Sequence, residues 1–148
     1  MTRFSDSLKS NNFLVTAELT PPKGTDLGPI FDKAEYLKDA VCAFNLTDSH
    51  RSMMSMSPLA VAHLLAGKGI ESILQITCRD RNKIALQADL LAAYALGASN
   101  ILCLTGDHPQ NGDHPDAKAV FDMEAVALLR TIKSLESGVD MNGNPLNG

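Results

Sequence analysis

The chain has 148 residues, of which 45% are hydrophobic and 20% charged, and its net charge is −4 with an isoelectric point near 5.4. This length suits one domain with a real core, and the acidic balance gives no basic footprint for a nucleic-acid partner. No apolar run approaches the ~20 residues of a membrane span, and the N-terminus lacks the apolar core of a secretion signal, so we expect a cytoplasmic protein. Three cysteines without a Cys-x-x-Cys pair indicate reduced thiols rather than disulfides or a zinc site.

The first part of the chain alternates strand and helix patterns. The β-rich run 13–20 stops at two prolines and predicts a strand. Asp26 can cap the helix that follows, whose apolar residues recur at helical spacing. A second strand is predicted over 41–47, and Ser57 before a proline predicts the start of a second helix.

The same alternation continues to residue 136. A third strand is predicted over 70–77, and Asn82 can cap the next helix. The apolar run 101–104 is flanked by glycines and reads as a fourth strand, buried on both faces of a parallel sheet. After a polar loop a last helix is predicted, and residues 137–148, rich in Gly and Asn, form a loose tail outside the domain 1–136.

The order is therefore βαβαβαβα, with strand ends near Glu18, Thr47, Thr77 and Thr105. Ends that recur about every 30 residues need a parallel sheet with right-handed crossovers. Two architectures compete, a small open doubly wound sheet and part of a (β/α)₈ TIM barrel. Because a barrel typically needs ~250 residues, this length holds four of its eight βα units, a half barrel.

Polar side chains gather at the predicted carboxyl ends of the strands, where α/β proteins place their ligands. Glu18 lies inside a strand pattern, where a carboxylate is either functional or an outward-facing residue of an edge strand. In a dry pocket with a raised pKa, such a glutamate is a suitable general acid. Asp107 follows Gly106 just past the fourth strand and either faces a flat ligand or bonds a nearby N–H in a turn.

Other site classes have little support. The loop 106–116 contains Gly-Asp-His-Pro twice, which suggests a metal site, but a flexible loop offers no rigid scaffold, so a turn-rich loop that covers the site is the better interpretation. The chain lacks the glycine-rich motifs of Rossmann and P-loop nucleotide sites.

Four motifs together resemble a known family. They are Ala17-Glu-Leu-Thr-Pro-Pro-Lys23, the strand end Asn45-Leu-Thr-Asp48, Gln75-Ile-Thr-Cys-Arg-Asp-Arg-Asn82 and Leu104-Thr-Gly-Asp107. In this order and spacing they look like successive motifs of the methylenetetrahydrofolate reductases. The chain resembles one branch of that family, in which some members are fused to a homocysteine methyltransferase. The resemblance covers residues 13 to about 136.

The resemblance implies a flavin barrel in which FAD takes a hydride from NAD(P)H and reduces 5,10-methylenetetrahydrofolate to 5-methyltetrahydrofolate. Glu18 resembles the family's acid, and Asp107 the aspartate that meets both flavin and pterin. The other matched positions correspond to residues that lie at the flavin in that family. Asp122 is matched less securely, because the loop before it is longer than in the family pattern. These implied cofactor-binding residues are Thr47, Asp48, His50, Gln75, Thr105, Gly106, Asp107 and Asp122.

The chain also departs from the family pattern. Gln75 stands where many relatives have histidine, Thr105 stands where many have arginine, and the second half of the barrel is missing. A half barrel leaves two strand edges unpaired, which favours self-association or a second chain that supplies the missing half. Two hypotheses follow: an enzyme half that works when completed, or a flavin- or folate-binding or structural half barrel without turnover.

Overall fold

Four parallel strands in sequence order form the sheet of this protein. The computed structural model describes residues 3–10 and 13–147. Its strands are β1 (Thr16–Leu19), β2 (Ala43–Leu46), β3 (Ser72–Thr77) and β4 (Asn100–Leu104), and each pairs in parallel with the next. The predicted four βα units and parallel sheet are confirmed. The strands are shorter than the apolar runs that predicted them, although single bonds such as Cys42 N–H to the Val15 carbonyl (2.8 Å) extend beyond β1 and β2.

One helix follows each strand, and the first three of these helices return the chain to the start of the next strand. These helices are α2 (Gly28–Leu37), α3 (Pro58–Ala66), α4 (Lys83–Ala95) and α5 (Ala125–Glu136). The predicted cap Asn82 accepts hydrogen bonds from the amides of Ile84 and Ala85 (3.1 and 3.0 Å). Asp26 instead bonds the Gly28 amide, one residue ahead of the cap position, and the Ser57 side chain makes no cap bond.

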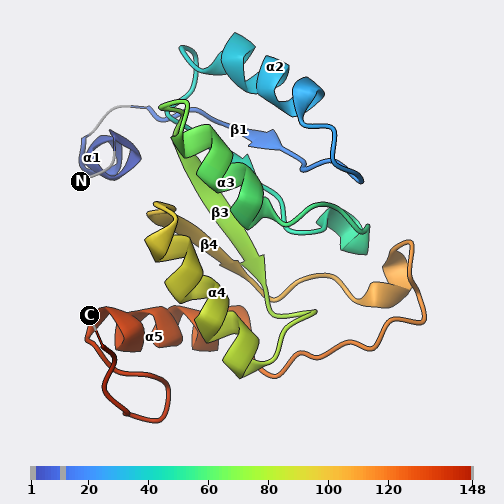
Figure 1. Cartoon of the computed structure of the whole chain (residues 1–148), viewed down its shortest axis with the longest axis vertical. Coiled ribbons are helices and arrows are strands. Elements are labelled where there is room, and N and C mark those ends of the chain that lie inside the picture. The colour runs from blue at the N-terminus through green and yellow to red at the C-terminus, as the bar shows by residue number, and fades with distance from the viewer. Residues whose placement is uncertain (1–2, 11–12, 148) are drawn as a thin grey trace.

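The helices cover one face of the sheet, and the core lies between them. In Figure 1, α3 and α4 lie in front of β3 and β4. Because strand side chains alternate between faces, every second residue meets the helices. The buried strand residues of this core are Leu19, Phe44, Leu46, Leu74 and Ile76. They pack on buried helix residues such as Ala34, Val61, Leu65, Leu86, Leu90 and Leu128.

The alternate side chains of the strands form a second face, here called the open face. Glu18 of β1 is exposed on it, Asn45 and Gln75 are half-buried, and Leu102 of β4 keeps 40% of its surface exposed. In a closed (β/α)₈ barrel this face is the interior, filled by side chains of all eight strands. Among the described residues no strand pairs with the outer edge of β1 or of β4. The sheet is therefore a half barrel.

Three short helices were not predicted: α1 (Arg3–Lys9) and the 3₁₀ helices η1 (His50–Ser52) and η2 (Pro109–Asn111). The amide of Phe4 donates to a Glu71 carboxylate oxygen (3.0 Å) and so ties α1 to the amino end of β3. None of the helices in the described part of the chain is long and apolar enough to cross a membrane.

Residues 137–147, which follow α5, form a closed turn. The Asp140 carboxylate accepts bonds from the amides of Asn142 and Asn144 and from the Asn144 side chain, each at 2.8 Å. These bonds hold the pKa of Asp140 below its ordinary value. The Met141 amide bonds Gln87 of α4 (2.9 Å). Asp and Asn side chains that bond nearby backbone order a turn without any periodic pattern. The division into a domain 1–136 and a separate tail stays a prediction.

Candidate functional site

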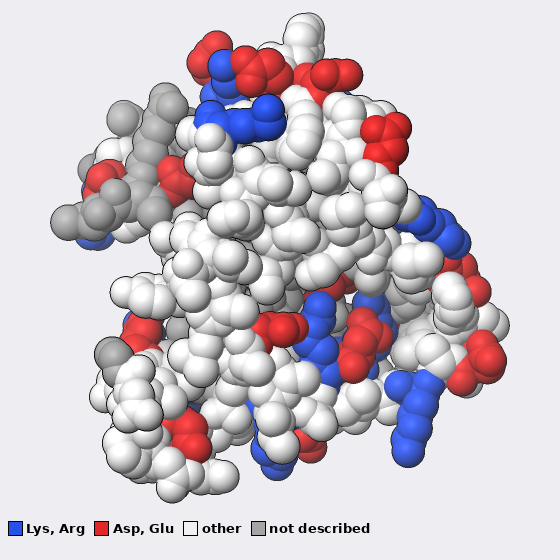
Figure 2. All heavy atoms as spheres, viewed as in Figure 1, with Lys and Arg blue, Asp and Glu red and all other residues white. Residues whose placement is uncertain are grey.

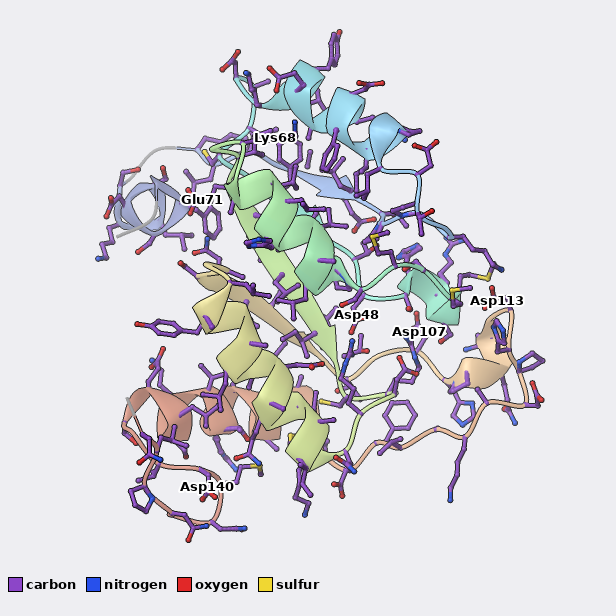
Figure 3. All side chains as sticks on the ribbon, viewed as in Figure 1. Asp48, Lys68, Glu71, Asp107, Asp113 and Asp140 are labelled. Atoms are coloured by element: carbon purple, nitrogen blue, oxygen red, sulfur yellow. The ribbon has the colours of Figure 1, made fainter. Side chains whose placement is uncertain are left out.

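The loops that follow the carboxyl ends of β2, β3 and β4 lie together at one edge of the sheet. Figure 3 shows Asp48, Asp107 and Asp113 at this end, with Lys68 and Glu71 at the other. Figure 2 shows basic and acidic side chains gathered near the carboxyl end of β3, while much of the surrounding surface is uncharged. We call this region the carboxyl edge. The topology thus brings the predicted site segments of β2 to β4 to one place.

Asp48 is the most firmly held carboxylate of the carboxyl edge. It is 5% exposed. One oxygen accepts bonds from the Thr77 amide (2.8 Å), the Thr77 hydroxyl (2.9 Å) and Arg81 (2.7 Å), and the other accepts from Arg81 (3.2 Å). Arg81 also pairs with Asp89 of α4 at 2.8 Å. The carboxylate therefore joins the end of β2 to the end of β3 and to α4, and both of its oxygens are already occupied by protein donors.

Thr47, one residue earlier, is buried but lacks a partner. It is 1% exposed, and its hydroxyl oxygen has no hydrogen-bond partner among the described residues. A buried polar atom without a partner carries a free-energy cost of about 1–3 kcal/mol. Such an atom is an explicit candidate for a ligand contact.

Glu18 lies on the edge strand β1, in register with Asn45 of β2. It is exposed, and its carboxylate has no hydrogen-bond or ion-pair partner among the described residues. The dry pocket expected around it is not formed by this chain alone. The physical reason is that β1 borders the open side of the half barrel, so nothing in the described chain covers this side chain.

The turn after β4 places Asp107 at the surface. Gly106 adopts φ +94°, and a Cβ there would lie 3.1 Å from the Cβ atoms of both Thr77 and Arg79. Glycine allows this conformation and this close approach at little cost. The Asp107 side chain is exposed, while its carbonyl accepts a bond from the Ser52 hydroxyl (2.9 Å).

The remaining predicted site residues divide between the edge and its surroundings. Gln75 is half-buried on the open face, in register with Leu102. His50 is exposed at the start of η1. The Thr105 hydroxyl accepts from the Ala125 amide (3.3 Å) at the start of α5. Asp122 accepts from the Lys83 amide (3.0 Å) at the start of α4 and so supports a helix terminus.

The loop with two Gly-Asp-His-Pro repeats is held by its second aspartate. Asp113 forms an ion pair with Lys23, accepts from the Met54 amide (2.9 Å) and contacts His114. In the described part of the chain, no group of three or more His, Cys, Asp or Glu side chains is placed to hold a metal ion. Asp113 thus links this loop to the segments that follow β1 and β2.

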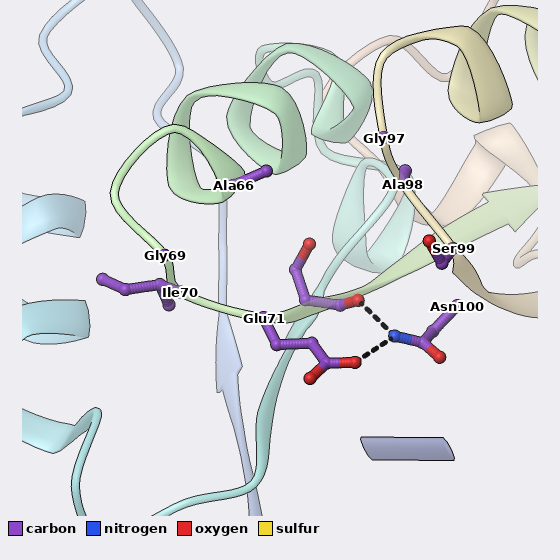
Figure 4. A pocket seen from close by; sticks show the side chains of 9 residues that line it. Ala66, Gly69, Ile70, Glu71, Gly97, Ala98, Ser99 and Asn100 are labelled. Atoms are coloured by element: carbon purple, nitrogen blue, oxygen red, sulfur yellow. Dashed lines mark hydrogen bonds between the residues drawn. The ribbon is translucent and has the colours of Figure 1, made fainter. Parts of the chain in front are cut away.

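A pocket of about 170 Å³ lies away from the carboxyl edge, at the amino ends of β3 and β4. Glu71 and Ser72 line it and both accept bonds from the Asn100 side chain (2.9 and 3.3 Å), as Figure 4 shows. Ligand sites in parallel α/β folds lie at the opposite ends of the strands. This pocket is therefore not the candidate site.

Comparison with known proteins decides the family. A model of the family described as methylenetetrahydrofolate reductase matches residues 3–143. The chain belongs to the methylenetetrahydrofolate reductase family. One curated relative, methylenetetrahydrofolate reductase 2 of Schizosaccharomyces pombe, is 38% identical over 64 residues, which are 43% of this chain. The match spans 10% of that relative's length.

The sequence pattern missed three residues that shape the carboxyl edge of this reductase-family chain. Arg79 and Ser52 are buried, at 3% and 9% exposure, and Arg81 bonds Asp48. Both arginines belong to the segment that carried the family resemblance, but their contacts are long-range. The sequence did carry one signal for these contacts: Arg79, Asp80 and Arg81 alternate in charge, and Asp89 follows within the next helix. Buried arginines are usually paired, so nearby carboxylates indicate ion pairs.

Proposed function

We propose that this chain is the first half of a flavin-dependent methylenetetrahydrofolate reductase barrel. When completed by a second half barrel, it binds FAD at the carboxyl edge and reduces 5,10-methylenetetrahydrofolate to 5-methyltetrahydrofolate with NAD(P)H. Family membership over residues 3–143 supports the reaction class. The observation that carries the site is the buried Thr47 hydroxyl without a partner at that edge.

The residues present fit a flat, polar-edged cofactor. The Thr47 hydroxyl can donate and accept a hydrogen bond, and the half-buried Gln75 amide offers a further donor and acceptor on the open face. Gly106 presents backbone without a side chain in the turn after β4. The bound flavin supplies the transfer of hydride from nicotinamide to folate. Asp48 is not one of its contacts in this proposal, since both carboxylate oxygens bond Thr77 and Arg81.

Two carboxylates serve the folate substrate in this proposal. Glu18 donates a proton to the folate ring nitrogen as the five-membered ring opens, and Asp107 accepts a hydrogen bond from the pterin. Glu18 is exposed in the half barrel. Covering the open face would exclude water from its carboxylate and form the dry pocket in which a glutamate can act as an acid. Turnover is therefore expected only after the barrel is completed.

The two free sheet edges give the route to completion. Unpaired edge strands present rows of N–H and C=O groups that a further strand can satisfy. Exposed apolar side chains lie beside both edges, Val15 (45%) next to β1 and Leu102 (40%) on β4. Strands of another chain, or of a second copy of this one, can complete these edges.

The test combines cofactor binding with turnover. The purified chain is mixed with FAD, with and without the barrel segment of a family reductase that begins where the match to this chain ends. Size-exclusion chromatography with absorbance at flavin wavelengths shows whether FAD co-elutes and at what mass. NAD(P)H oxidation that depends on methylenetetrahydrofolate then measures turnover.

Variants assign the roles. We expect Glu18→Gln to abolish turnover by the completed barrel while FAD still co-elutes. Glu35→Gln should leave both unchanged, because Glu35 is an exposed residue of α2 that pairs only with the exposed Lys38 among the described residues. FAD binding without turnover in the completed wild-type barrel would favour a flavin-binding half barrel without catalysis. No FAD binding in either mixture would refute the proposal.

A further inference from the structure

The loop after β2 is held in an unusual backbone conformation. Ser49, Arg51 and Ser52 have φ values of 48°, 52° and 58°. Non-glycine residues rarely adopt this left-handed region, because it is strained for a residue with a Cβ. Such conformations persist only where the surrounding structure holds them. The contacts of Ser52 and Arg79 are what hold this loop.

Ser52 lies at the centre of these contacts. Its hydroxyl is within hydrogen-bond distance of two carbonyl oxygens in the turn after β4, those of Asp107 (2.9 Å) and His108 (3.2 Å). A hydroxyl has one proton and therefore donates to one of these carbonyls at a time. The same oxygen accepts a bond from the Arg79 guanidinium (3.1 Å). One buried hydroxyl thus links the β2 loop to the turn that carries Asp107.

Arg79 is itself fixed in place. Its side chain is 3% exposed, and it forms a two-bond fork with Asp80 (2.8 and 2.7 Å). The hydrogen bond and charge of Asp80 outweigh the effect of burial and raise the pKa of Arg79. The nitrogen that bonds Ser52 also reaches the Ser49 carbonyl (3.3 Å). Arg79 therefore supports the strained loop at both ends.

The two loops also pack without a gap. A Cβ on Gly112 would lie 1.9 Å from the Ser52 carbonyl oxygen, so only glycine fits there. Farther along, the Met54 amide donates to Asp113 (2.9 Å). The segment 106–113 thus lies directly on the segment 49–54. Hydrogen bonds and close packing give Asp107 a defined backbone position although its side chain is exposed.

From these contacts we propose that Ser52 and Arg79 are positioning residues, which fix the backbone at Asp107 and thereby set its place beside a bound flavin. The proposal rests on the proposed function for the ligand, but the contacts stand without it. Neither residue needs to touch the cofactor, because Ser52 acts through the Asp107 and His108 carbonyls and Arg79 acts through Ser52.

The test separates loop order from ligand binding. Ser52→Ala removes the hydroxyl and leaves the backbone requirement unchanged. Ser55→Ala is the matched control, because the Ser55 hydroxyl bonds only the neighbouring Met56 carbonyl among the described residues, at 3.4 Å. Arg79→Lys keeps the charge but loses the guanidinium fork. Hydrogen exchange is followed at the amides of Gln110 and Asn111, which bond His108, and of Gly112, which bonds the Pro109 carbonyl at the start of η2.

We expect Ser52→Ala and Arg79→Lys to speed exchange at these amides about fivefold or more, the size that loss of one hydrogen bond produces. FAD affinity, measured without urea where each variant is fully folded, should fall by a similar factor, and Ser55→Ala should match wild type in both exchange and FAD affinity. Unchanged exchange in Ser52→Ala would overturn the proposal, and so would faster exchange with unchanged FAD affinity. If wild type binds no FAD, the proposed function fails, and exchange alone then shows whether Ser52 orders the turn.

Discussion

Replacing Asp48 by asparagine tests whether this carboxylate holds the carboxyl edge together. The change keeps the shape of the side chain but removes its charge and one acceptor. Asp48 accepts four bonds, from Thr77 and Arg81 only. Whichever way the new amide is turned, its NH₂ group faces a donor of Thr77 or Arg81. At least one buried donor is then left without its partner.

The expected loss follows from the burial of the pair. Breaking a buried ion pair costs roughly 3–5 kcal/mol. We take about 3 kcal/mol, since the Arg81 side chain is 21% exposed and keeps Asp89 as a second partner. For a domain of this size the free energy of unfolding falls by about 2 kcal/mol per molar urea, so a loss of about 3 kcal/mol lowers the urea midpoint by about 1.5 M.

Urea unfolding followed by circular dichroism measures this shift. Asp89→Asn is the matched control, because Asp89 bonds the same arginine but its side chain is 41% exposed. Exposed pairs contribute about 0–1 kcal/mol, so this variant should lose less than about 0.5 M. Equal losses in both variants would refute the reasoning, and so would a stable Asp48→Asn protein that no longer binds FAD, since Asp48 would then be a ligand contact.

Three further predictions concern the same region and the core. Gly106→Ala should lower the urea midpoint, because φ is +94° and the new Cβ meets Thr77 and Arg79 at 3.1 Å, whereas Gly24→Ala, with open space around it, should not. Hydrogen bonds from Lys23 and Met54 lower the pKa of Asp113 in the folded protein. Its contribution to stability is therefore present above the pKa of the unfolded chain, about 3.9, and is lost as the pH falls toward the lower pKa of the folded state. Asp113→Asn should lack this loss of stability in acid, which urea unfolding at several pH values measures. Burial raises the pKa of Cys103 to about 11. Its contribution to stability is therefore present below the pKa of the unfolded chain, about 8.5, and is lost as the pH rises toward 11. Iodoacetamide at pH 8.5 should label Cys103 more slowly in the folded protein than in urea.

Periodicity was enough to predict the four βα units. Apolar runs such as 70–77 and the cap at Asn82 are local signals, and the structure contains the corresponding elements β3 and α4. The cap predicted at Asp26 was displaced by one residue, because its side chain bonds Gly28 and leaves Leu27 at the cap position. Element type is thus readable from pattern, while termini depend on which backbone group a side chain reaches.

The contacts of the candidate site were less predictable. Strand ends placed Asp48 and Asp107 at one edge, as the topology requires. No local pattern showed that Asp48 bonds Arg81, 33 residues away, or that Ser52 bonds the Asp107 carbonyl, 55 residues away. The exposure of Glu18 has a different origin, since it follows from the free edge of β1 rather than from the residues around it.

The distribution of satisfied and unsatisfied groups indicates what a second half barrel must contribute. In the loops after β2 and β3, buried charges such as Asp48 and Arg79 find their partners within this chain. On the open face, the side chains of Glu18 and Gln75 have no hydrogen-bond partner among the described residues, and at the carboxyl edge the buried Thr47 hydroxyl has none either. The described residues therefore hold these loops by themselves. Under the proposed function, further strands cover the open face and exclude water from Glu18, so we expect FAD binding at the carboxyl edge to precede turnover.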